Sequence, residues 1–257
     1  MSAIPPDGVR PPSPLLFLVE RQRALIEAAS LFPATPLLRL APRGDGHPVM
    51  VLPGFTAGDE TTLPLRRYLR SLGYYVHGWR LGRNFGFNGD RQRFESRLAR
   101  RMDELFARHG RKLSLVGWSL GGIYAREIAR TAPQRVRQVI TLGSPFAGRG
   151  HGSNIRRLYE LVTGRRIRDH DPEVLAHLHE PPPVPSTAIF SRTDGVAHWR
   201  ACLEQPAVQT DNIEVRGSHC GLGFNPVVFY AIADRLAQPE NEWQPFSRTG
   251  WRRLFYG

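Results

Sequence analysis

The run LSLVGWSLGG, residues 113–122, decides the fold. Residues 112–116 are mostly apolar and predict a buried strand, and a helix is expected directly afterwards, over residues 120–130. Between them, Gly117, Ser119 and Gly121 form the pattern G-x-S-x-G, which suits a tight turn from a strand into a helix. Glycine at positions 117 and 121 removes the Cβ atoms that would collide with neighbouring backbone. We expect this turn to hold Ser119 above the sheet, at a helix N-terminus whose dipole favours developing negative charge.

Outward from this run, apolar strands alternate with amphipathic helices. Strands are expected at residues 48–52, 74–79, 112–116, 136–142, 186–190 and 212–215, and helices at residues 61–72, 91–109, 120–130 and 226–236. The alternation predicts an α/β fold, with a mostly parallel sheet and helices on both faces. We expect a proline-rich flexible arm over residues 1–13 and a single domain over residues 14–257.

Residues 148–185 interrupt the alternation. This segment includes a predicted helix over residues 154–163 and ends in the prolines of residues 181–183. It is too long for a simple connection and too short for a separate domain, so it predicts a small cap inserted between two strands. Because it leaves the sheet at the edge that carries Ser119, we expect the cap to lie over the mouth of the site.

A serine nucleophile requires a histidine base and a carboxylate that orients the histidine, in the chain order Ser, Asp or Glu, His. Asp194 directly follows the strand at residues 186–190, and His219 follows the strand at residues 212–215. In a parallel sheet both positions lie at the carboxyl edge, together with Ser119. Asp171 lies in the cap and Asp211 precedes a strand, so Asp194 is the better candidate for the acid.

Acyl transfer also requires N–H groups that stabilise an oxyanion. The first candidate is the N–H of Leu120, which follows the serine. The second is the N–H of Phe55, in the loop after the strand at residues 48–52. Both positions are expected at the edge of the sheet that carries Ser119.

With these motifs in place, residues 48–236 resemble the α/β-hydrolase superfamily. Within it, the chain is similar to bacterial esterases and lipases whose oxyanion loop reads His-Gly-Phe, although Pro53 replaces the histidine here. The resemblance implies hydrolysis of carboxylic esters through an acyl-serine, with Ser119, Asp194 and His219 as the triad and no cofactor. A thioesterase or acyltransferase using the same triad is an alternative, as is a non-catalytic binding protein on this fold.

The net charge of the chain does not by itself select a class of partner. Lys and Arg number 35 against 23 Asp and Glu, for a net charge of +12. Such a charge attracts nucleic acid, anionic lipid and acidic substrates alike. No recognition motif accompanies the arginines, so we expect no nucleic-acid partner, and a small-molecule or lipid ester as substrate. The four histidines within residues 151–179 lack zinc-ligand spacing, so no metal site is expected.

Three features bear on location and packing. Residues 15–31 predict an amphipathic helix that either packs on the core, which we expect, or touches a membrane. The aromatic residues of the tail, 241–257, are likewise expected to pack on the body, with contact at a membrane interface as the alternative. Without a long apolar run or a secretory signal, the chain is expected in the cytoplasm, with peripheral contact at the inner face of the membrane also open. Cys202 and Cys220 are either a disulfide or close thiol pair, or two buried free thiols.

Overall fold

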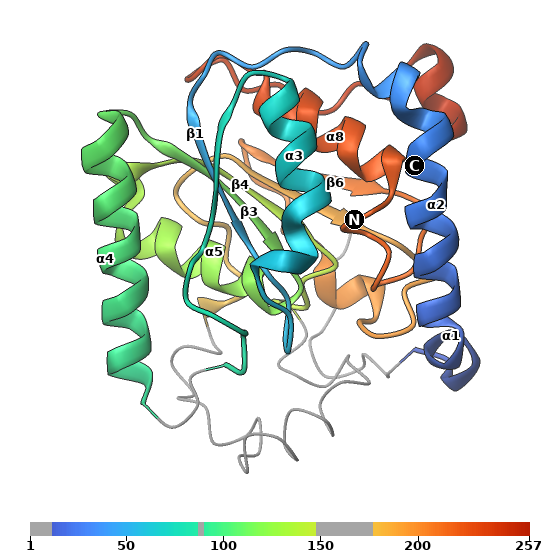
Figure 1. The fold of residues 1–257 in the computed structure, drawn as a ribbon, viewed down its shortest axis with the longest axis horizontal. Coiled ribbons are helices and arrows are strands. Elements are labelled where there is room, and N and C mark those ends of the chain that lie inside the picture. Colours follow the sequence, from blue (N-terminus) through green and yellow to red (C-terminus); the bar gives the residue numbers. More distant parts are fainter. Residues whose placement is uncertain (1–11, 87–89, 148–176) are drawn as a thin grey trace.

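The structure is a computed structural model that describes residues 12–86, 90–147 and 177–257. Within these residues, six parallel strands form one sheet in the order β2-β1-β3-β4-β5-β6 (Figure 1). The strands are β1 (Pro48–Leu52), β2 (Tyr75–Gly78), β3 (Leu113–Trp118), β4 (Val136–Leu142), β5 (Ser186–Phe190) and β6 (Thr210–Glu214). The expected parallel sheet is therefore confirmed.

The helices of the described residues precede, connect or follow these strands along the chain (Figure 1). They are α1 (Pro14–Leu18), α2 (Glu20–Leu38), α3 (Leu63–Ser71), α4 (Arg91–His109), α5 (Leu120–Thr131) and α8 (Pro226–Leu236). Short 3-10 turns occupy η2 (Asp59–Thr62), η3 (Pro133–Arg135), η5 (Trp199–Cys202) and η6 (Gly250–Leu254). The bounds of α4 and α8 agree with those expected from the apolar periodicity.

Both faces of the sheet are covered, because successive side chains of a strand point to opposite faces. In β1, Val49 and Val51 pack in the cluster that includes α3 and α8. Met50 and Leu52 pack in the cluster formed with α4 and α5. Strands buried on both faces explain the nearly continuous apolar runs in the sequence.

The parallel arrangement brings the functional loops to one edge. In the register of the sheet, Trp118 lies opposite Leu142, Leu142 opposite Ile189, and Ile189 opposite Ile213. The chain therefore leaves β3, β4, β5 and β6 at the same carboxyl edge. That edge receives Ser119 and the loops that carry Asp194 and His219.

The N-terminal helices correct one expectation. Most of their large apolar side chains face away from the core: Leu25 is 72% exposed and Ile26 is 70% exposed, whereas Glu20 is buried. Only a few apolar residues of α2, among them Leu31 and Leu38, contact the core. The physical reason is that polar side chains of α2 bind loops far away in the sequence, which fixes the rotation of the helix. Within the described part of the chain, we find no helix with the length and apolar character needed to cross a bilayer.

The tail packs on the body in part, as expected. Phe246 and Tyr256 are buried, and Arg248 forms an ion pair with Asp211, Nη2 to Oδ1, at 3.1 Å. Three other large apolar residues of the tail, at positions 251, 254 and 255, stay exposed. The arm is described only from residue 12, and the cap only from residue 177. The helix expected at residues 154–163 lies outside the described residues, as do Asp171, His151 and His170.

Candidate active site

The turn after β3 holds Ser119 in a strained backbone conformation. Its φ is +53°, in the left-handed region that L-residues rarely adopt, and α5 begins at the next residue, Leu120. A Cβ atom at Gly117 would lie 2.3 Å from Cα of Gly122, and one at Gly121 would lie 2.4 Å from a carbonyl oxygen of β1. Both glycines are therefore required by close backbone approach, as the sequence predicts. Strain of this kind at a serine is typical of functional sites.

Asp194 and His219 form a buried pair. Asp194 Oδ2 lies 2.7 Å from Nδ1 of His219. Its other oxygen, Oδ1, accepts hydrogen bonds from the N–H groups of Val196 at 2.8 Å and Ala197 at 2.7 Å. Because an ionised carboxylate only accepts hydrogen bonds, Nδ1 carries the proton and Nε2 of a neutral ring keeps its lone pair. The loops after β5 and β6 thus present one imidazole in a fixed orientation.

The end of β4 joins this pair to the serine. The backbone N–H of Ser119 donates to the carbonyl oxygen of Leu142 at 2.8 Å. At the next residue, Gly143, a Cβ atom would lie 3.1 Å from both Asp194 Oδ2 and His219 Nδ1. Gly143 has a φ of +54°, so its backbone turns closely around the pair. The serine turn and the Asp194–His219 pair therefore both contact the end of β4.

A tryptophan makes a second link between the serine and histidine loops. Nε1 of Trp118 donates to the carbonyl oxygen of His219 at 3.1 Å. Within the described residues, no hydrogen bond joins Oγ of Ser119 to the ring of His219. Hydrogen bonds between a nucleophile and its base are often long without substrate and shorten when substrate binds. The arrangement has the parts for proton transfer from Ser119 to His219.

The loop after β1 lies against the serine. A Cβ atom at Gly54 would be 3.3 Å from Cβ of Ser119, so Phe55 follows directly on a backbone in contact with the turn. The buried side chain of Asn84 donates from Nδ2 to the carbonyl oxygen of Pro53 at 2.8 Å and shapes this loop. Sequence reasoning missed Asn84, because a turn-rich stretch indicates a loop without showing which other loop it binds.

The structure thus brings the predicted site residues to one place. They are Ser119, Asp194, His219, Phe55 and Leu120, with Gly117 and Gly121 in the turn. The rejected alternative, Asp211, lies in β6 and instead binds the tail, accepting a hydrogen bond from Phe246 N–H at 2.7 Å.

Two glutamates of α2, which sequence reasoning missed, hold the acid and base loops. Oε1 of Glu20 accepts from the N–H groups of Gly195 at 2.7 Å and His219 at 3.1 Å, and Oε2 accepts from Cys220 N–H at 2.9 Å. Two turns further along the helix, Oε1 of Glu27 accepts from the N–H of the residue before His219, at 2.7 Å. The sequence carries one signal of this role, the spacing that places both acids on the same side of the helix.

The charges around His219 set its protonation. Burial disfavours the imidazolium, but the negative charges of Asp194 and Glu20 outweigh burial and raise the pKa of His219 above its usual 6.5. The two carboxylates therefore stabilise the imidazolium form of His219, which is the form that a histidine takes after it accepts a proton.

The cysteines form no disulfide, one of the two alternatives that the sequence left open. Cys202 and Cys220 are free thiols. Burial raises the pKa of both, and for Cys220, which donates its N–H to Glu20, the pKa reaches about 12. Thiols held in the protonated form are poor nucleophiles.

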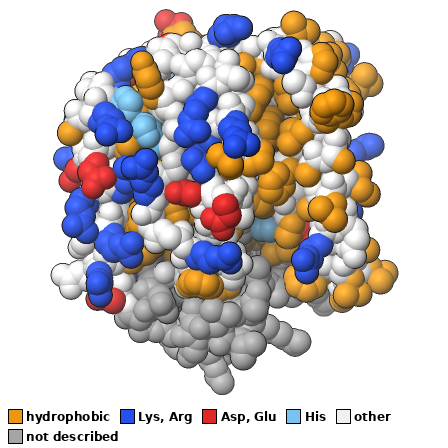
Figure 2. Space-filling view, viewed as in Figure 1, with side chains coloured by type: hydrophobic (Ala, Val, Ile, Leu, Met, Phe, Trp, Pro, Cys, Tyr) orange, Lys and Arg blue, Asp and Glu red, His pale blue; other side chains and the backbone are white. Residues whose placement is uncertain are grey.

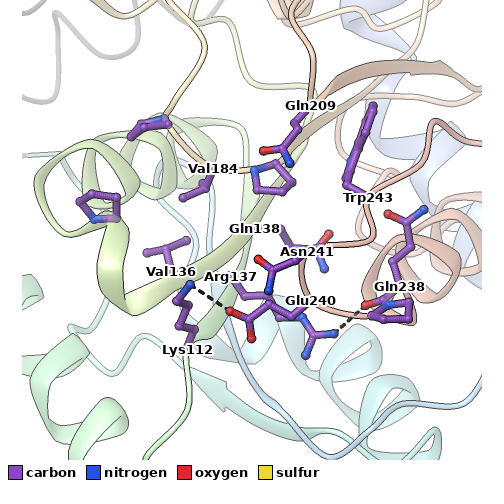
Figure 3. A pocket seen from close by; sticks show the side chains of 14 residues that line it. Lys112, Val136, Arg137, Gln138, Val184, Gln209, Gln238, Glu240, Asn241 and Trp243 are labelled. Atoms are coloured by element: carbon purple, nitrogen blue, oxygen red, sulfur yellow. Dashed lines mark hydrogen bonds and ion pairs between the residues drawn. The ribbon is translucent and has the colours of Figure 1, made fainter.

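A hollow at the other edge of the sheet lies apart from this site (Figure 3). It is lined in part by Val136 and Pro185, which begin or precede strands, and an ion pair of 2.9 Å between Lys112 Nζ and Glu240 Oε1 crosses it. Its position at the amino edge separates it from Ser119. Within the described residues, we find no group of three His, Cys, Asp or Glu side chains that could hold a metal ion.

Comparison with solved structures supports the fold. The chain is similar to lipase B of Aspergillus fumigatus (TM-score 0.57, 17% identity), a match that covers 77% of this chain and 54% of that one. It is similar to the Bacillus licheniformis lipase BlEst2 (TM-score 0.56, 16% identity, 77% and 95% covered). It is also similar to a thioesterase domain from the curacin biosynthetic pathway (TM-score 0.52, 14% identity, 78% and 92% covered).

These likenesses show that the chain has the α/β-hydrolase fold. The chain spans about half the length of the Aspergillus lipase. Because an Aspergillus protein stands beside a Bacillus one, the narrower resemblance to bacterial enzymes is not supported. No family model matches the sequence, and no curated protein matches it.

Proposed function

We propose that the protein is a serine hydrolase that cleaves carboxylic esters through an acyl-serine intermediate. The observation that carries the proposal is the buried Asp194–His219 pair, 2.7 Å between Oδ2 and Nδ1, joined through the end of β4 to the strained turn that holds Ser119. Two lipases on the same fold make ester chemistry the first choice among the reactions open to this site.

In the proposed mechanism, Oγ of Ser119 attacks the ester carbonyl while Nε2 of His219 takes its proton. Asp194 holds the ring and stabilises the imidazolium, and the N–H groups of Phe55 and Leu120 stabilise the tetrahedral oxyanion. The imidazolium then protonates the leaving alcohol, which leaves an acyl-serine. Water, deprotonated by His219, hydrolyses the acyl-serine and restores the enzyme. No cofactor takes part in these steps.

The first test is covalent labelling with a fluorophosphonate probe. We expect the wild-type protein to be labelled, and Ser119→Ala to be unlabelled and to lose about 10³-fold or more in hydrolysis of a p-nitrophenyl ester. Ser144→Ala, at a buried serine on the next strand end, is the matched control and should keep the label. A labelled Ser119→Ala protein, or no labelling of the wild type, would refute the proposal.

The second test separates the related reactions. A panel of p-nitrophenyl esters of increasing chain length, with an acyl-CoA and an acceptor alcohol in parallel, measures which acyl donor and which acceptor the acyl-serine uses. We expect turnover of the esters with water as acceptor. Faster turnover of the acyl-CoA, or transfer to the alcohol, would make the protein a thioesterase or an acyltransferase instead.

A further inference from the structure

The outward face of α1 and α2 is an apolar surface. It consists of Leu15, Phe17, Leu18, Val19, Leu25, Ile26, Phe32, Leu37 and Leu40, all exposed. We call this set the N-terminal apolar face. Figure 2 shows hydrophobic side chains gathered on the right of the view, where Figure 1 places α1 and α2. Phe32 is the most exposed member, at 88%. Large exposed apolar patches mark surfaces that bind something apolar.

The rotation of α2 that exposes this face is fixed by its polar side. Glu20, Arg23 and Glu27 are three and four residues apart and so lie on one side of the helix. Both glutamates bind backbone N–H groups of the histidine loop, and Arg23 donates from Nη1 to the carbonyl oxygen of Thr193 at 2.6 Å. Turning the helix to bury its apolar face would strip these buried donors of their acceptors, which is costly. The outward position of the apolar face is therefore built into the fold.

The exposed charged residues within residues 12–44 are all positive. Glu20 and Glu27 are the only acidic residues between residues 12 and 44, and both are turned toward the body. Arg21, Arg39 and Arg43 are exposed, and within the described residues none of the three has a carboxylate at ion-pair distance. The surface that faces outward from these helices thus combines large apolar side chains with uncompensated arginines.

We propose that the N-terminal apolar face docks the protein on an anionic lipid surface. Apolar side chains enter the boundary between headgroups and acyl chains, and the arginines meet anionic headgroups, the pattern of amphipathic helices that lie in a membrane plane. A second copy of this chain would fit poorly, because dimerisation through this face gathers six arginines without an acidic partner. The net charge of +12 favours the same occupant.

Docking here would also bring the lipid surface close to the loops that carry Asp194 and His219. The backbone of α1 lies on the acid loop: a Cβ atom at Gly195, next to Asp194, would be 2.5 Å from the carbonyl carbon of Leu16. The N-terminal helices and the loops of Asp194 and His219 are therefore in direct contact. If the chain hydrolyses esters, which rests on the proposed function, its substrates are esters dissolved in the lipid layer.

Vesicle sedimentation tests the docking. Full-length protein is mixed with phosphatidylcholine vesicles, with and without phosphatidylglycerol, and its bound fraction is measured. We expect binding to the anionic vesicles that Leu25→Gln/Ile26→Gln/Phe32→Gln weakens about tenfold or more, because each large apolar side chain gains strongly on leaving water. Glutamine keeps the helix, and circular dichroism checks the fold. Tyr75→Gln/Val208→Gln, at exposed apolar residues elsewhere, is the matched control and should bind as the wild type does.

Several outcomes would overturn the proposal. The first is that the wild type does not bind anionic vesicles, and the second is that the triple variant binds as well as the control does. The third is that the wild type forms a dimer that the triple variant loses, while neither protein binds vesicles. Arg21→Gln/Arg39→Gln should reduce binding to the anionic vesicles, and unchanged binding would refute the role of charge.

Fluorophosphonate labelling is measured on the same protein. Vesicle binding without labelling would refute only the proposed function, and labelling without vesicle binding would refute only the docking.

Discussion

Replacing Glu20 tests how α2 supports the candidate active site. Its carboxylate accepts hydrogen bonds from three backbone N–H groups, those of Gly195, His219 and Cys220. An unpaired buried donor costs about 1–3 kcal/mol, so Glu20→Ala should lower the free energy of unfolding by about 3 kcal/mol or more. Because the acid and base loops lose a common anchor, kcat/KM for a p-nitrophenyl ester should fall by roughly 10²-fold.

The isosteric variant Glu20→Gln separates charge from shape. Its side-chain oxygen can still accept from Gly195 and His219, but its negative charge is gone. A base must be neutral to take a proton, and the raised pKa of His219 places the acid limb of the kcat/KM profile above pH 6.5. Removing the charge of Glu20 lowers that pKa, so the acid limb should move to lower pH.

Glu27→Gln is the matched control, because Glu27 anchors Ser218 N–H in the same loop but is not among the charges that raise the pKa of His219. Urea unfolding and pH profiles of all three variants are the measurements. If the acid limb of Glu20→Gln moves no further than that of Glu27→Gln, the electrostatic reasoning is wrong. If Glu20→Ala keeps wild-type stability and turnover, the anchoring role is wrong as well.

Three further predictions concern the body of the protein. Arg126 and Glu204 form a fully buried ion pair, so Arg126→Met should destabilise the fold by about 3–5 kcal/mol in urea unfolding, and adding Glu204→Leu should restore most of the loss; no restoration would contradict the pairing. Burial and the charge of Arg137 lower the pKa of His47 from 6.5 to about 4. As the pH falls, His47 therefore takes up a proton in the unfolded chain before it does so in the folded one. The free energy of unfolding should fall by up to about 3 kcal/mol from pH 6.5 to 4. His47→Gln should reduce this decrease. Gly121→Ala places a methyl group against a carbonyl oxygen of β1 and should cost about 2 kcal/mol or more; a neutral effect on the melting temperature would contradict the close approach.

Much of the fold and site could be predicted because the deciding signals are local. Short runs of four to seven residues, most of them apolar, marked the strands, and a helical rhythm placed α4 at its observed bounds. Residues that directly follow parallel strands lie at the same edge of the sheet. The positions of Ser119, Asp194 and His219 after β3, β5 and β6 are therefore enough to predict that they lie at one edge.

The residues that were missed act through contacts between distant parts of the chain. Asn84 shapes the loop after β1 across 31 residues, and Glu20 reaches Gly195 and His219 across 175 and 199 residues. No periodicity in the sequence records such a contact. The expectation of a helix packed through its apolar face holds only in part, at residues such as Leu31 and Leu38, for the same reason.

The sequence by itself determined the alternation of strands and helices, the turn at Ser119 and the order of the candidate triad, because each follows from spacing between neighbours along the chain. Only the tertiary structure decided which side of α2 faces the body. Burying its apolar side would have satisfied the hydrophobic effect locally, but the polar side binds N–H groups of two loops whose positions exist only after the sheet has formed. Those hydrogen bonds set the rotation of the helix and leave its apolar face outward.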